Sequence, residues 1–296
     1  MKNNILKIFS GTALVLMMIL VALACCNMMG YVQIAAAETG NMNDVASEPL
    51  KYYTGTTAMA SVTETVNFTR YTVTEGNANP FCPQYYNLDS GTYPNACAPI
   101  GGSIVVGYYD RYCTDLIPNV TPGFMLNGNY RYFPMASNAT AIQSVIVSLY
   151  NSMGTNSLMP GTTRTQYQTG LSTYVTNAGY NISFTSVMSG GSLDVNGIIS
   201  QLTSGKVVTL YIANPNLCSV TFGSTSATYT IYPYTGNHIE IAYKYKLIKY
   251  YDTINSNYRT DILLGVSTGM YEEKSGWYYV GYSATNLDHA DATYIY

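Results

Sequence analysis

The hydrophobic pattern of this 296-residue chain changes its period at Lys206. Between Cys97 and this residue, apolar side chains recur every three to four positions, a spacing that predicts helices buried along one face. Downstream, segments rich in Val, Ile, Tyr and Thr alternate apolar with polar residues, which predicts strands. A chain that forms its helices first and its strands second is expected to fold as an α+β domain with an antiparallel sheet.

The positions of the expected elements follow from this pattern. Helices are predicted from Cys97 to about Tyr112, and over Asn138–Met153, Thr163–Ala178 and Leu193–Thr203. Strands are predicted over Val207–Ala213, Ala227–Pro233, His238–Tyr251, Tyr258–Thr268, Trp277–Tyr282 and Ala292–Tyr296. The stretch from Leu116 to Tyr132 contains two prolines and is predicted to be a loop.

The first 37 residues have the composition of a secretory signal peptide. Lys2 and Lys7 precede a long apolar run, and Ala35 to Ala37 supply the small residues expected before a cleavage site. The run is also long enough to span a bilayer, so an uncleaved N-terminal anchor is the alternative. We therefore expect a protein that is secreted or held at the cell surface through this segment.

The rest of the chain divides into two parts. Residues 38–79 are polar, and they are interpreted as a linker, a pro-segment or an edge hairpin, since Ser61 to Thr74 alternates Thr and Val. Residues 80–296 are expected to form one folded domain. Nucleic acid is an unlikely partner for a chain with a net charge of −3 and no cluster of Lys or Arg. No metal, phosphate or dinucleotide motif is present, so no cofactor is expected.

Four cysteines lie outside the leader: Cys82, Cys97, Cys113 and Cys218. An oxidising compartment favours disulfides, and a bridge between Cys82 and Cys113 is one pairing that the sequence leaves open. If Cys97 is a free nucleophile, the other three cannot all pair.

Cys97 stands at the start of the first predicted helix. Pro99 fits the first turn of that helix, where its missing N–H is no loss. The unpaired backbone N–H groups at a helix start favour a thiolate over a thiol, which is the setting of a nucleophilic cysteine. A small buried residue at a helix start is the alternative interpretation.

A nucleophilic cysteine needs a base to take its proton. The chain has only two histidines. His238 follows a Gly-Asn turn and is predicted to open a strongly patterned strand, which makes it the candidate base. His289 lies in the loop-like stretch NLDHAD near the C-terminus and is predicted to be a surface residue.

Two segments resemble the motifs of papain-like cysteine peptidases, specifically the bacteriocin-processing-peptidase-like group. They are NACAPIGGSIVVGYYDRY at residues 95–112 and GNHIEIAYKY at residues 236–245. The resemblance implies a papain-like fold, in which a helical N-terminal half carries the cysteine at the start of a central helix and packs on a C-terminal antiparallel sheet or half-barrel. It implies Cys97 as nucleophile, His238 as general base, and a peptide or protein as substrate. Ile100 departs from the motif, which has Thr at that position.

The group that orients His238 is less clear from the sequence. Asp252 lies fourteen residues further along the same predicted strand, on the order of 45 Å away, and is excluded. The returning strand is expected to bring Ser267 and Thr268 beside His238, where a hydroxyl could orient the imidazole. Glu240 lies on the same strand face as His238 and is a weaker candidate, interpreted mainly as a solvated strand residue.

The oxyanion of an acyl-transfer intermediate also needs donors. The backbone N–H of Cys97 is one, and Gln84 is the candidate side-chain donor, with an ordinary loop residue as the alternative. The sequence thus predicts a secreted papain-like thiol hydrolase of peptide or amide bonds. The alternative is a catalytically inactive protein of the same fold that acts as a cell-surface binding or structural protein.

Overall fold

The computed structural model describes residues 51–252, 256–283 and 285–296. The chain divides into two units, Met1–Pro49 and Leu50–Tyr296, and the description below concerns the second. The predicted leader therefore lies outside the described residues. No helix in the described ranges is long and apolar enough to cross a membrane.

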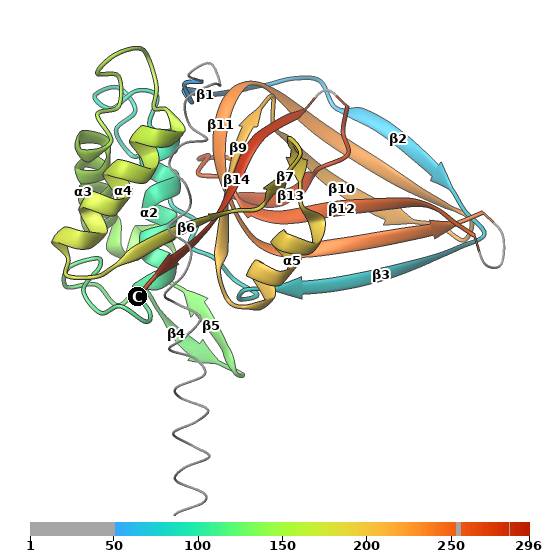
Figure 1. Cartoon of the computed structure of the whole chain (residues 1–296), viewed down its shortest axis with the longest axis horizontal. Coiled ribbons are helices and arrows are strands. Elements are labelled where there is room, and N and C mark those ends of the chain that lie inside the picture. Colours follow the sequence, from blue (N-terminus) through green and yellow to red (C-terminus); the bar gives the residue numbers. More distant parts are fainter. Residues whose placement is uncertain (1–50, 253–255, 284) are drawn as a thin grey trace, which may run out of the picture. The chain divides into compact units, whose positions relative to one another are not determined.

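A long, curved strand, β11 (Ser226–Tyr251), organises the larger of the two layers (Figure 1). The ten-stranded sheet has the order β10-β13-β12-β11-β9-β14-β6, and β1, β2 and β3 also pair with β11. Every pairing is antiparallel. The partner strands are β1 (Gly55–Ala58), β2 (Val62–Asn67), β3 (Arg70–Asn77), β6 (Ile182–Ser186), β9 (Val207–Ala213), β10 (Asn216–Phe222), β12 (Asn257–Ser267), β13 (Ser275–Tyr279) and β14 (Asn286–Ile295).

Four of these strands close on themselves. The C-terminal half of β11 pairs with β12, β12 pairs with β13, β13 meets β10, and β10 pairs with the N-terminal half of β11. One strand of 26 residues can serve both ends of this circuit because strands twist and bend along their length. The core enclosed on this side contains Leu210, Leu217, Val266 and Tyr278.

The helical layer is built around α2 (Cys97–Tyr109), in which every residue is buried. Helices α3 (Ala139–Ser152) and α4 (Arg164–Asn177) pack beside it, and α5 (Val195–Thr203) lies apart from them against the sheet (Figure 1). Glycines allow the close contacts, because a Cβ at Gly101 would lie 2.9 Å from Ile239 Cγ2 of β11. Helix α2 is thereby held directly against β11 at the residue that follows His238.

Most expected helices and strands are found, with ends that differ by a few residues. The mixed architecture with a large antiparallel sheet confirms the α+β expectation. Two predicted strands, Ala227–Pro233 and His238–Tyr251, are one strand, so His238 lies in the middle of β11 and does not open a strand. Pro233 is tolerated because β11 continues past it while its partners change.

The predicted loop at Leu116–Tyr132 contains a hairpin, β4 (Gly123–Leu126) and β5 (Asn129–Tyr132). Its turn is Asn127-Gly128, with φ of 50° and 76°, the left-handed pair that a two-residue hairpin turn requires. The prediction missed the hairpin, although this dipeptide was a signal for it. A second, two-residue pair, β7 (Met188–Ser189) and β8 (Ser192–Leu193), and a short 3₁₀ helix η2 (Met135–Asn138) complete the fold.

Candidate active site

The candidate site lies at an interruption in the pairing along one edge of β11. Strand β9 pairs with Asn237–Glu240, and β12 lies on the opposite edge. Because Asn237 pairs with both Ala213 of β9 and Gly55 of β1, strand β1 shares the edge of β12. On that edge β1 ends its pairing at Asn237 and β12 begins at Ile241, so residues 238–240 have no strand partner there.

The start of α2 fills this interruption. Asn95, in the left-handed region at φ 58°, reverses the chain just before the helix, and its amide is bonded to Asn156 Oδ1 at 3.0 Å. Cys97 is then the first residue of α2, and the backbone N–H of Ile239 lies close enough to its thiol to lower the pKa of that thiol. The cysteine and the histidine strand, 141 positions apart in the sequence, therefore meet at this edge.

Burial dominates the chemistry of the Cys97 thiol. Only 5% of the residue is exposed, and this desolvation raises its pKa to about 12. The backbone N–H groups of Ile239, Ala98, Cys97 and Gly55 act in the opposite direction. The N–H groups expected to favour a thiolate at the helix start are thus present, but desolvation outweighs them and the pKa of the thiol is raised.

His238 is equally buried, at 4% exposure. Its Nε2 lies 2.7 Å from the backbone carbonyl oxygen of Thr268, so Nε2 carries the proton and donates it to that carbonyl. Nδ1 is therefore the basic nitrogen, and it has no hydrogen-bond partner among the described residues. Burial lowers the pKa of the imidazole to about 4, and the Thr268 carbonyl opposes this shift. The ring is neutral at pH 7 and has a lone pair available.

A main-chain carbonyl orients the His238 ring, and the two hydroxyls expected in that role form other hydrogen bonds. Ser267 Oγ donates to Pro83 O at 2.6 Å, and the Thr268 hydroxyl donates to the carbonyl of Glu273. Asp252 is exposed just beyond the end of β11. The sequence indicated Thr268 as the orienting residue, but through its hydroxyl and not its carbonyl oxygen. The direction of that carbonyl depends on where the β11–β12 ladder ends, which the sequence does not show.

Ile100 helps to fix this carbonyl. Gly269, the residue after Thr268, has a φ of 72°, and a Cβ on it would lie 2.8 Å from Ile100 Cγ2. The helix start therefore packs directly on the turn that presents the Thr268 carbonyl. The apolar residue that departs from the papain-like motif makes a contact that a threonine hydroxyl would make poorly.

Glu240 is a buried carboxyl and not the solvated strand residue expected from the sequence. It is 1% exposed, and neither carboxyl oxygen has a hydrogen-bond partner among the described residues. Burial raises its pKa to about 8, so the carboxyl is protonated at neutral pH. The alternation of polar and apolar residues predicted that Glu240 faces solvent, but both faces of β11 are covered at this position.

Gln84 is exposed, and its amide donates to Ser275 Oγ at 3.0 Å. Its role as an oxyanion donor stays a prediction. Two other predictions about side chains require correction. His289 lies within β14, where its Nε2 is 3.2 Å from Asp291 Oδ1, and is not a loop residue. Cys82 and Cys113 are free buried thiols, as are Cys97 and Cys218, so the suggested Cys82–Cys113 bridge is not formed.

The segment 52–58, here called the covering segment, closes the site from outside. Its Gly55 N–H reaches the Cys97 thiol, and the buried side chain of Tyr53 lies close enough for the two to influence each other electrostatically. Two hydrogen bonds join the segment to β11. The Thr54 N–H donates to the Asn237 carbonyl at 3.2 Å, and the Asn237 side-chain amide donates to the Tyr52 carbonyl at 3.0 Å. The segment therefore lies against the buried thiol.

The covering segment is tethered at its start by an ion pair between Lys51 and Asp288. We expect Lys51→Ala to increase the alkylation rate of Cys97 by about two- to fivefold, the effect of losing a partly exposed ion pair on an opening equilibrium. The measurement is the rate of iodoacetamide labelling at Cys97, followed by peptide mass spectrometry. Lys249→Ala, which removes an exposed lysine from the far part of β11, is the matched control. An unchanged rate in Lys51→Ala would show that this tether does not control access.

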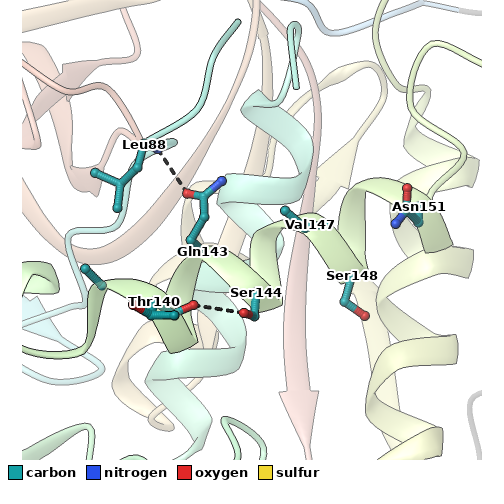
Figure 2. Close-up of a pocket in the computed structure, with 8 residues that line it drawn as sticks. Leu88, Thr140, Gln143, Ser144, Val147, Ser148 and Asn151 are labelled. Carbon is teal, nitrogen blue, oxygen red and sulfur yellow. Dashed lines mark hydrogen bonds between the residues drawn. The ribbon is translucent and has the colours of Figure 1, made fainter. Parts of the chain in front are cut away.

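A separate hollow lies along the outer side of α3 and is shown in Figure 2. Gln143 accepts the backbone N–H of Leu88 at 3.0 Å, and Ser144 Oγ donates to Thr140 O at 2.9 Å. The lining contains no titratable side chain. No group of His, Cys, Asp and Glu in the described ranges is arranged to hold a metal ion.

Comparisons with models of protein families, with curated proteins and with solved structures find no match to this chain. Its function therefore has to be inferred from the chemistry of the site around Cys97 and His238.

Proposed function

We propose that the protein is a cysteine peptidase, a thiol hydrolase of peptide or amide bonds, with Cys97 as nucleophile and His238 as general base. The observation that supports it is that the Cys97 thiol lies beside the backbone N–H of Ile239, the residue next to His238, at the unpaired edge of β11. The Ile239 N–H approaches the Cys97 thiol, while His238 is held through Nε2 and leaves Nδ1 free. A helix that carries the cysteine against a sheet that carries the histidine is also the arrangement expected of a papain-like fold.

The chemistry would proceed in two halves. His238 Nδ1 takes the Cys97 proton, the thiolate adds to the substrate carbonyl, and the backbone N–H groups at the start of α2 donate to the oxyanion. The imidazolium then protonates the leaving amine, and a thioester forms on Cys97. Water, deprotonated by His238, hydrolyses the thioester and restores the thiol. The Thr268 carbonyl keeps the ring oriented throughout.

The closed protein is a resting form of this site. With the pKa of Cys97 raised and that of His238 lowered by burial, both groups are neutral. Displacement of the covering segment admits water and substrate, which reverses the desolvation that sets both pKa values. The substrate that replaces the segment would be an extended chain, because the vacated edge of β11 offers main-chain hydrogen bonds.

One observation favours the alternative function of a catalytically inactive binding protein. It is the burial of Cys97 and His238 beneath a segment that makes at least two hydrogen bonds to β11. If the segment never opens, the exposed surface alone could act, as a binding or structural protein of the cell surface.

Alkylation separates these two functions. We expect His238→Asn to slow iodoacetamide labelling of Cys97 at least tenfold at pH 5 to 7, because the histidine no longer accepts the thiol proton. Labelling at Cys82, Cys113 and Cys218 should not change, and these three buried thiols are internal controls for opening and unfolding. Hydrolysis of an unfolded protein substrate should be lost in Cys97→Ser. Equal labelling of Cys97 with and without His238 would refute the proposed dyad.

A further inference from the structure

Glu240 is placed to act on His238. The two residues are two positions apart in a regular part of β11, so their side chains leave the same face, about 7 Å apart along the strand. The residues between and after them, Ile239 and Ile241, belong to the core on the α2 side, whereas Ala242 belongs to the core on the opposite side. Glu240 and His238 therefore share the face of Ala242.

Thr268 lies directly beyond the end of the β11–β12 ladder. The last pair of that ladder is Ile241 with Ser267, so Glu240 and Thr268 are the first residues past it on their two strands. The same Thr268 supplies the carbonyl that accepts the proton of His238 Nε2. Glu240 thus shares its strand face with the imidazole that this hydrogen bond orients, and both residues are buried in the closed protein.

The carboxyl has no other evident task. No ion pair among the described residues includes Glu240, and both of its oxygens lack hydrogen-bond partners there. An unpartnered buried carboxyl is costly to a folded protein, whereas an apolar residue of similar size would pack without that cost. Such groups are commonly retained where their charge has a role in the chemistry.

Among the described residues, two tyrosines feel the charge of Glu240. Burial raises the pKa of Tyr278 of β13, and the charges of Glu240 and Asp288 add to this shift. Burial likewise raises the pKa of Tyr234, and the charges of Glu273, Glu240 and Glu272 add to it. Both tyrosines therefore stay neutral below pH 9, and His238 is the group on the same strand face that a charge on Glu240 would stabilise as a cation.

We propose that Glu240 is a positioning residue for the base, whose ionisation stabilises the His238 imidazolium and thereby favours transfer of the Cys97 proton to Nδ1. While Glu240 is protonated, the pair stays in its neutral form, with the proton on sulfur. When Glu240 gives its proton to solvent through the opened site, its carboxylate stabilises the charge that His238 gains as the thiolate forms. This inference rests on the proposed function, since it assigns a partner to the same base.

The test is the pH profile of Cys97 alkylation in Glu240→Gln, a neutral variant of the same size. The ratio of the wild-type rate to the variant rate should be close to one below pH 6. It should rise to the order of tenfold above pH 8, the effect expected of a unit charge about 7 Å from the imidazolium in a partly buried site. Glu75→Gln makes the same chemical change on β3, where the side chain is 56% exposed, and should keep the wild-type profile.

The outcomes separate this inference from the proposed function. If Cys97 labelling depends on His238 but has the same pH profile in wild type and Glu240→Gln, the role of Glu240 is refuted and the dyad stands. If labelling does not depend on His238 at any pH, the proposed function fails.

A second measurement does not depend on folding of the variant. The chain has two histidines, so NMR can follow the His238 ring in wild type, with His289→Asn used for assignment. The His238 signal should respond to the ionisation of Glu240 near pH 8, and a signal that is flat from pH 6 to 9 would contradict the coupling.

Discussion

Glu240→Gln is expected to make the protein more stable relative to wild type as the pH rises. The difference in the free energy of unfolding between variant and wild type should be about 5 kcal/mol larger above pH 8 than below pH 4.5. Burial raises the pKa of Glu240 from 4.5 to about 8. Each unit of pKa shift corresponds to about 1.4 kcal/mol of stability. The measurement is the free energy of unfolding from denaturant titrations between pH 4 and 9.

The sign follows from proton binding. Between pH 4.5 and 8 the carboxyl is ionised in the unfolded chain but protonated in the folded protein, so folding takes up a proton. Stability from this group is fully present below pH 4.5 and is lost as the pH rises through 8. Glutamine cannot ionise and removes the loss.

His238 gives the opposite slope. Its pKa falls from 6.5 to about 4 on burial, so its contribution is present above pH 6.5 and is lost as the pH falls through 4. Between pH 4.5 and 6.5 the two slopes cancel in wild type, whereas Glu240→Gln should gain stability with pH across this window. Glu75→Gln controls for the chemical change at an exposed site. Parallel stability curves for wild type and Glu240→Gln would show that Glu240 is solvated in the folded protein.

Asp291→Ala is expected to lower the free energy of unfolding by about 3 kcal/mol at pH 7, the cost of leaving a buried partner without its countercharge. Asp291 is fully buried, and it accepts two hydrogen bonds from Arg164 at 2.8 Å and one from Gln168 at 2.8 Å. Burial alone would raise the pKa of Asp291, but His289 and Arg164 hold it below its usual value. The ion pair joins the first turn of α4 to β14.

The value lies at the lower end of the usual range for a broken buried ion pair because Arg164 is 32% exposed and regains some hydration. Denaturant midpoints measure the loss. Asp252→Ala removes an exposed carboxylate beyond the end of β11 and should change stability by less than about 0.5 kcal/mol. A similarly small change in Asp291→Ala would mean that water replaces the carboxylate at the Arg164 side chain.

The sequence pattern predicted a helix or strand correctly where the signals lie within that element. Helix α4 follows Thr163, which caps it in a capping box with Gln166, and the periodic residues Tyr167, Leu171 and Val175 are buried as their spacing predicts. Strand β9 has the predicted bounds, Val207–Ala213. Such features depend on side-chain period and on capping within a few residues, and both are legible in a sequence.

The sequence pattern did not predict features that depend on pairing between strands far apart in the chain. The break predicted around Pro233 to Asn237 is absent, because the partner strands of β11 change there from β10 to β9 and from β2 to β1. The part of residues 38–79 that the structure describes includes β1, β2 and β3, all of which pair with β11. Nothing local to these residues indicates which strand they join.

The sequence alone determined the identity of the candidate nucleophile and base, since Cys97 at a helix start and His238 in a strongly patterned strand are local features. Only the tertiary structure decided their state. It brought the thiol to the Ile239 N–H, assigned orientation of the ring to the Thr268 carbonyl, placed Gly55 and Tyr53 against the thiol, and buried His238 and Glu240. Desolvation depends on every element packed around a group, and this is why the charge state of the site could not be derived from its motifs.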